Sequence, residues 1–116
     1  MVAPHMLASA IGSGGVEVLS TPWLIALLET AARAAVEPLL PEGQATVGVR
    51  VDVRHLAPTP PGVMVRATAE LVELDGRRLL FRVEAFDPVD KIGEGTHERA
   101  VVDPRRLLAR ADQKRT

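Results

Sequence analysis

His55 is the residue whose position most directly suggests chemistry. It ends the alternating series Val47, Val49, Val51 and Val53, so regular strand pleating points its side chain to the same face as these valines. That face is apolar, which predicts an imidazole turned toward the protein core. A buried imidazole needs hydrogen-bond partners, and it titrates near neutral pH, as a general base must. From parity alone, a catalytic base and a structural histidine bonded to a nearby carbonyl both remain open.

Glu29 and Thr21 are the other two candidates. Glu29 shares a helical face with Ile25 and Ala32, through spacings of four and three, so its carboxylate is expected against apolar surface. Such a setting raises a carboxyl pKa unless a hydrogen-bond donor is present. The alternative is a solvent-side ion pair with Arg33 at the i, i+4 spacing. Thr21 is explained equally well as a helix cap, and the sequence alone does not separate these interpretations.

The densest polar cluster lies in residues 95–99, which read GTHER. Arg99 could bind the phosphate or adenine group of a nucleotide-bearing ligand, but a solvated strand face explains the cluster more simply. A metal site at His97 and Glu98 is not expected, because adjacent strand residues point to opposite faces and no HExxH helix or carboxylate cluster accompanies them. The sequence therefore predicts neither a metal nor a cofactor.

Composition limits the classes of partner. The 14 Lys and Arg residues against 15 Asp and Glu residues give a net charge of -1, which offers no general attraction to nucleic acid or to an anionic membrane. One tryptophan and two phenylalanines provide no stacking platform for single strands. The absence of cysteine excludes thiolate chemistry and agrees with a reducing, cytoplasmic location. No segment has the pattern of an export signal or a membrane span.

The hydrophobic period changes after one long predicted helix. Apolar residues recur at helical spacing from Leu24 to Leu39, with a start signal at Thr21-Pro22 and a stop signal at Pro41-Glu42-Gly43. A period of two then predicts antiparallel strands. The predicted strands span residues 47–55, 63–71, 79–85 and 91–102, with turns at 59–62, Asp75-Gly76 and 88–90, and a basic helical tail follows from Pro104.

One alanine-rich helix followed by four long, meandering strands has one economical packing, in which the sheet curls around the helix. This predicts an α+β hot-dog fold, a curved antiparallel sheet around one long central helix. Residues 1–116 are expected to form a single domain, with the basic tail beginning at about residue 104. Gly93 and Gly95 could let the last strand bend or admit a ligand. The open edge and uncovered face of such a sheet predict a homodimer or a higher homo-oligomer.

Several segments in fixed order carry a family resemblance. They read VLSTP at residues 18–22, Leu28-Glu29, HLAPTPPG at 55–62, GRRL at 76–79 and IGEGTHER at 92–99. Together they closely resemble the fluoroacetyl-CoA thioesterase-like family of the hot-dog thioesterase superfamily, over roughly residues 8–108. The resemblance implies a hot-dog fold, a dimer with sites near the subunit interface, and hydrolysis of acyl-CoA thioesters.

Residue by residue, the resemblance implies that Thr21, Glu29 and His55 fall on the family's catalytic threonine, glutamate and histidine. In this hypothesis His55 is the base, Glu29 orients or polarises a reactant, and Thr21 is either the nucleophile or the positioner of water. The alternative is a non-catalytic acyl-CoA or acyl-carrier-binding module; a dehydratase is a third interpretation, for which no motif is present. Substrate contacts are expected at Gly15, Pro22, Gly95 and Arg99.

The acyl specificity follows from a departure from the family pattern. Fluoroacetyl-specific members carry a bulky aromatic residue a few positions before the threonine, where this sequence has Gly14 and Gly15. We therefore expect a broader range of small and medium acyl-CoA substrates.

Helix geometry constrains how the three candidate residues can meet. If the helix begins at Pro22, Glu29 lies about 12 Å from Thr21 along the axis, at roughly 1.5 Å per residue, and the two cannot touch. Either the helix starts later, or the three residues are assembled across a dimer interface.

Overall fold

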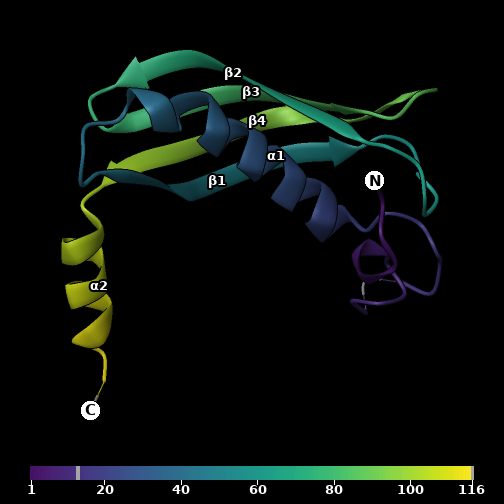
Figure 1. Cartoon of the computed structure of the whole chain (residues 1–116), viewed down its shortest axis with the longest axis horizontal. Coiled ribbons are helices and arrows are strands. Elements are labelled where there is room, and N and C mark those ends of the chain that lie inside the picture. Colours follow the sequence, from purple (N-terminus) through teal and green to yellow (C-terminus); the bar gives the residue numbers. More distant parts are fainter. Residues whose placement is uncertain (13, 116) are drawn as a thin grey trace.

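The structure, a computed structural model, describes residues 1–12 and 14–115. One long helix lies across the concave face of a four-stranded antiparallel sheet, as the sequence predicts (Figure 1). The elements in chain order are the 3-10 helix η1 (Pro4–Met6), helix α1 (Thr21–Val36), the 3-10 helix η2 (Glu37–Leu39), strands β1 (Ala45–His55), β2 (Arg66–Asp75), β3 (Arg78–Phe86) and β4 (Lys91–Val102), and helix α2 (Pro104–Asp112). None of these described helices is long and apolar enough to cross a membrane.

The strand order in the sheet is β1-β4-β3-β2. Strands β2, β3 and β4 form the predicted meander, but β1 pairs with β4, so the expectation of a four-strand meander is wrong for β1. The reason is the connection at residues 56–65, whose prolines prevent a tight hairpin. This connection crosses to the opposite edge of the sheet. Its Thr59 carbonyl accepts from the Leu19 N–H at 2.8 Å, and its Thr59 hydroxyl donates to Asp87 at 3.0 Å.

The ends of β2 differ from the prediction. The strand begins at Arg66 rather than at Val63, because the backbone before it pairs with the N-terminal segment instead. Val2 donates to the Val63 carbonyl at 2.9 Å, and Gly62 donates to the Val2 carbonyl at 2.8 Å. At its other end β2 runs to Asp75, and the turn that follows is formed by Gly76 and Arg77. The turn was predicted at Asp75-Gly76, one position earlier. Gly76 takes a positive φ of 59°, which glycine adopts without a steric penalty.

A bulge in β1 decides which of its side chains face α1. Gly48 and Arg50 pair with successive residues of β4, so Val49 between them has no partner on that strand and the alternation slips by one position. Beyond the bulge the predicted parity holds, and His55 faces the helix. Before it Gly48 faces the helix, while Val49 is 57% exposed. The predicted orientation is therefore confirmed for His55 and wrong for Val47 and Val49.

The core lies between α1 and the concave face of the sheet. The inner face of α1 buries a residue every fourth position, and the two central strands supply the opposing apolar side chains. Gly93 of β4 lies directly beneath Leu24, since a Cβ atom added to Gly93 would stand 2.9 Å from a Leu24 methyl carbon. The buried core residues of these elements are Leu24, Leu28, Ala32 and Val36 of α1, and Leu79, Phe81, Val83, Ala85 and Ile92 of the sheet.

Helix α2 extends away from the sheet, past the edge formed by β1 (Figure 1). Asp103 caps its first turn by accepting from the Arg105 N–H at 2.9 Å. Leu107 and Leu108 are both exposed on this helix. The helical tail from Pro104 that the sequence predicts is present, and within the described chain its apolar residues contact little else.

Substitution of Gly93 by alanine tests the close approach of α1 to β4. The added methyl must displace Leu24 in a filled core, so we expect the free energy of unfolding to fall by about 1–3 kcal/mol. Gly15→Ala is the matched control, because a Cβ atom at Gly15 meets nothing within 4 Å. Urea unfolding of both variants measures the difference, and equal stabilities would contradict the described packing.

Candidate active site

Thr21 and His55 are brought together by the packing of α1 on β1. Thr21 is the first residue of α1 and His55 is the last of β1, and Thr21 Oγ1 lies 2.8 Å from His55 Nδ1. A hydroxyl and an imidazole at hydrogen-bond distance are the arrangement required for proton transfer from the hydroxyl, or from a water beside it, to the ring.

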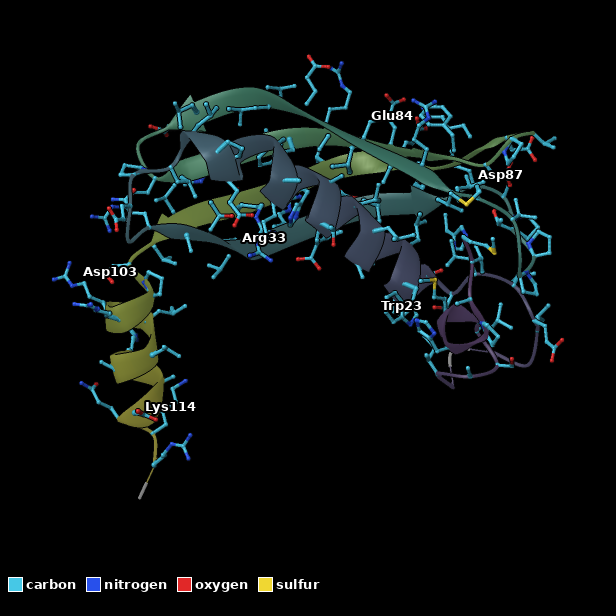
Figure 2. All side chains as sticks on the ribbon, viewed as in Figure 1. Trp23, Arg33, Glu84, Asp87, Asp103 and Lys114 are labelled. Carbon is cyan, nitrogen blue, oxygen red and sulfur yellow. The ribbon has the colours of Figure 1, made fainter. Side chains whose placement is uncertain are left out.

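Ser20, rather than Thr21, caps helix α1. Its hydroxyl oxygen accepts from the Trp23 N–H at 3.3 Å, and its side chain is buried. The prediction that Thr21 caps the helix is therefore wrong, and its hydroxyl is left for His55. The start of α1 is also held from outside, since the Trp23 ring lies beside the N-terminal segment (Figure 2), edge-on to His5 at 5.1 Å between ring centroids.

Burial sets the protonation state of His55. Loss of solvent around the ring lowers its pKa below the ordinary value of 6.5, and a hydrogen bond with the Ala57 backbone opposes this only in part. The ring is therefore mostly neutral near pH 7, the form that can accept a proton. Its Nε2 atom is buried and has no hydrogen-bond partner among the described residues.

An open groove lies beside the Thr21–His55 pair. Its volume is about 330 Å³, and its lining also includes Val18 and the loop that follows β1. Pro22 is exposed next to Thr21, and a side chain at Gly15 would meet open space. The groove therefore gives an extended ligand access to both reactive side chains. Its lining residues are Val18, Thr21, His55, Leu56, Ala57 and Pro58.

Glu29 belongs to a second polar cluster, at the other end of β1. Its Oε2 atom lies 3.8 Å from Arg99 Nη1 and 4.0 Å from His97 Nε2, and it stands 2.6 Å from the place of a Cβ atom on Gly48. The alternative prediction, an ion pair with Arg33, is wrong. Arg33, labelled on α1 in Figure 2, pairs instead with Glu37 at 3.3 Å.

His97 and Arg99 face α1 and are almost completely buried, at 1% and 6% exposed. Arg99 donates from Nε to the Thr46 hydroxyl at 2.9 Å, from Nη2 to the Thr46 carbonyl at 3.0 Å, and from Nη1 to His97 Nε2 at 3.2 Å. Burial lowers the pKa of Arg99, and the Glu29 carboxylate opposes this shift. A solvated strand face, the simpler prediction for residues 95–99, is therefore wrong for these two side chains.

Gly48 and His97 belong to this cluster but were not predicted as site residues. A glycine inside a strand is a signal for a bulge or a close approach, and Gly48 is both. His97 could have been found from its spacing of two to Arg99, which places both on one face. The glycine at position 95 has a packing explanation, because a side chain there would overlap the Asp52 carbonyl of β1.

The two clusters do not meet within the chain. Helix α1 begins at Thr21, which excludes a later start and leaves Glu29 about 12 Å farther along the axis, at roughly 1.5 Å per residue. Each chain thus holds a hydroxyl–imidazole pair at one end of β1 and a carboxylate–guanidinium cluster at the other.

Comparison with known proteins identifies the family. The model of the fluoroacetyl-CoA-specific thioesterase family matches residues 2–105, which include both clusters. The chain belongs to this family. A member from Streptantibioticus cattleyicolor, a fluoroacetyl-CoA thioesterase, is 46% identical over 98 residues, which cover 84% of this chain and 70% of that protein.

Solved structures of the family and of its superfamily share the fold. A point mutant of the fluoroacetyl-CoA-specific thioesterase in complex with fluoroacetate and CoA superimposes with a TM-score of 0.93 at 40% identity, covering 99% of this chain and 94% of that one. A thioesterase superfamily member from Thermus thermophilus gives 0.90 at 33% identity, covering 97% and 84%. A hot-dog-like protein from Thermanaerovibrio acidaminovorans gives 0.89 at 28% identity, covering 99% and 85%. The hot-dog fold predicted from the sequence is thus confirmed.

Alanine substitutions at Ser20 and Thr21 should separate capping from chemistry in this member of the fluoroacetyl-CoA-specific thioesterase family. Ser20→Ala removes the cap and should lower the free energy of unfolding by about 1 kcal/mol. Thr21→Ala should lower it by less than Ser20→Ala does, because Thr21 caps nothing and its hydrogen bond to His55 is solvent-exposed. Denaturant unfolding measures both; a larger loss for Thr21→Ala than for Ser20→Ala would contradict the assignment of the cap.

Proposed function

We propose that this chain hydrolyses small and medium acyl-CoA thioesters to the free acid and CoA, with Thr21 and His55 as its reactive pair. Its family membership makes it an acyl-CoA thioesterase. The observation that carries the assignment of the pair is the 2.8 Å contact between the Thr21 hydroxyl and the His55 imidazole at an open groove. The rival function is a binding module with the same groove and no turnover.

In the proposed reaction, neutral His55 accepts a proton from an oxygen nucleophile as that oxygen attacks the thioester carbonyl. The nucleophile is Thr21 Oγ1 or a water that Thr21 positions. The tetrahedral intermediate then breaks its C–S bond, and the CoA sulfur takes the proton from the imidazolium. If Thr21 is the nucleophile, water hydrolyses the resulting acyl-threonine ester by the same proton route.

The N-terminus of α1 offers one backbone donor for the oxyanion of the intermediate. Pro22 has no N–H, while the amides of Trp23 and Leu24 donate to Ser20 at 3.3 and 3.0 Å. In the described chain this leaves the Thr21 amide as the remaining donor of the first turn. A helix start commonly leaves several backbone amides unpaired, but here a single one remains, so further charge stabilisation must come from elsewhere in the site.

We further propose that the missing component is the partner's Glu29 in a homodimer. Among residues 1–12 and 14–115, no strand pairs with the outer edge of β1, and its Val49 and Val51 side chains are exposed. Antiparallel pairing of two β1 strands around a twofold axis between Val51 and Asp52 would bring Gly48 of one copy opposite His55 of the other. The carboxylate over Gly48 would then stand near the Thr21–His55 pair of the partner.

The proposed substrate range is wider than fluoroacetyl-CoA. Gly14 and Gly15 leave the space before Thr21 without a large side chain, and a Cβ atom at Gly15 meets nothing within 4 Å. The open space there leaves room for larger acyl groups. Pro22, exposed beside the reactive threonine, is part of the proposed substrate surface. The almost completely buried Arg99 belongs to it only through Nη1, the atom that faces the Glu29 carboxylate.

Removal of either reactive side chain should abolish thioester hydrolysis without unfolding the protein. Thr21→Ala and His55→Ala should each lower kcat/KM by at least about 100-fold, the scale of general acid–base catalysis. Release of free CoA thiol from acetyl-, butyryl- and octanoyl-CoA measures this loss. The parental kcat/KM should also fall as the pH drops through a pKa below 6.5, because protonation removes the base.

Thr30→Ala is the control for these variants. Thr30 lies on the same helix, is exposed, and donates only to the Ala26 carbonyl, so this variant should keep the parental rate. Parental rates in Thr21→Ala and His55→Ala would contradict the assignment of Thr21 and His55 as the reactive pair. Absence of turnover in the parent on every acyl-CoA, with binding retained, would favour the binding module.

Subunit complementation tests the composite site. Thr21→Ala and Glu29→Gln should each be inactive alone. In a heterodimer of the two, one site retains the parental Thr21, His55 and Glu29, while the other site lacks both Thr21 and Glu29. Random mixing by co-expression or refolding makes about half of the dimers heterodimers, and each of these has one intact site of two. The mixture should therefore have about one quarter of the parental activity. No gain over the separate variants would show that each chain carries its own complete site.

A further inference from the structure

We infer that His97 is a positioning residue, a neutral hydrogen-bond acceptor that fixes the Arg99 guanidinium and thereby the Glu29 carboxylate. This inference rests on the proposed function, in which Glu29 serves the reactive pair of the partner. His97 itself is 1% exposed, and its Nε2 lies 4.0 Å from Glu29 Oε2, beyond hydrogen-bond distance. Its role is to hold the Arg99 guanidinium, and with it the Glu29 carboxylate, in one orientation.

The contacts of His97 determine its tautomer. His97 Nδ1 lies 2.9 Å from the Arg50 carbonyl, which can only accept, so Nδ1 carries the proton. In the neutral ring Nε2 is then an acceptor, and it receives the Arg99 Nη1 N–H at 3.2 Å. The Arg50 carbonyl belongs to the bulged part of β1, so the backbone irregularity that opens the strand also orients the imidazole.

The guanidinium is held from two sides. Thr46 accepts from Nε and Nη2 of Arg99, while His97 accepts from Nη1. With these atoms bound, Nη1 is also the guanidinium nitrogen that faces Glu29 Oε2, at 3.8 Å. Gly48 leaves the carboxylate its space on the other side. A change at His97 therefore reaches Glu29 through a single rotatable side chain.

The surroundings of the ring require an acceptor at Nε2. The charged groups that face the ring are Arg99 on its own strand and Glu29 on α1, and the Phe81 ring is stacked on it with centroids 6.4 Å apart. A donor in place of the Nε2 acceptor would point at the Arg99 guanidinium, which has only donors. It would also compete with Arg99 for Glu29 Oε2, which lies 4.0 Å from Nε2.

Two substitutions of similar size separate the two nitrogens. His97→Asn keeps a donor near Nδ1 for the Arg50 carbonyl and removes the acceptor for Arg99. His97→Gln places an amide oxygen near Nε2 and restores that acceptor. We expect His97→Asn to lower kcat at least about tenfold with KM little changed, the effect of losing one hydrogen bond to a charged group. His97→Gln should recover most of the parental kcat.

The difference in kcat between the Asn and Gln variants is a readout that a purely structural role would not move. Equal kcat values for the two variants would overturn the inference.

Two further variants keep the test decisive. Gly48→Ala places a methyl group against Glu29 Oε2 and leaves His97 intact, so a kcat loss there reports the carboxylate position even if His97 variants fold poorly. Glu29→Gln separates this inference from the proposed function. If Glu29→Gln keeps parental activity, the proposed role of Glu29 fails. If Glu29→Gln and Gly48→Ala are impaired while soluble His97→Asn is not, only the role of His97 fails.

Discussion

The close approach of helix α1 to the sheet is the constraint on which the rest of this structure depends. It is possible because glycines stand beneath the helix, Gly93 under Leu24 and Gly48 under Glu29. The first contact closes the hydrophobic core, and the second gives a carboxylate a place at the sheet surface. The same short separation allows Thr21, at the helix start, to reach the imidazole at the end of β1. Packing and chemistry thus share one geometric requirement.

Strand β1 supports two different electrostatic environments. At its end, His55 is desolvated, so a neutral ring is favoured beside a hydroxyl. Near its start, the buried Arg99 keeps its charge because a threonine, a histidine and a carboxylate surround it. The bulge at Val49 lets one strand turn the required groups toward α1 in both places. A regular strand would have directed one of the two sets to solvent.

Periodicity was enough to predict the helix, the strands and the wrapping of the sheet, because burial of one face leaves a direct trace in the residue order. Pairing was harder, since the partner of β1 depends on the path of the chain at residues 56–65. The direction of His55 followed from parity, whereas that of Val49 did not, because a bulge leaves no mark except a glycine.

The site was predicted in part for a related reason. The residue types and the resemblance selected Thr21, Glu29 and His55, but sequence separation carries no information on which of them meet. The contact of Thr21 with His55 depends on how α1 crosses β1. The burial of His97 and Arg99 depends on which face of β4 lies under α1, and their spacing of two shows only that they share a face.

Capping and chemistry fall on different residues at the start of α1, and this affects which substitutions the enzyme can tolerate. Because the buried Ser20 caps the helix, the neighbouring exposed Thr21 contributes little to the stability of the fold. Position 21 is therefore open to exchange of its reactive group with little risk to folding, in natural divergence or in the laboratory. Many enzymes must trade stability for new reactivity at such a position. Here stability depends on Ser20 and reactivity on Thr21, so substitutions can change one property without the other.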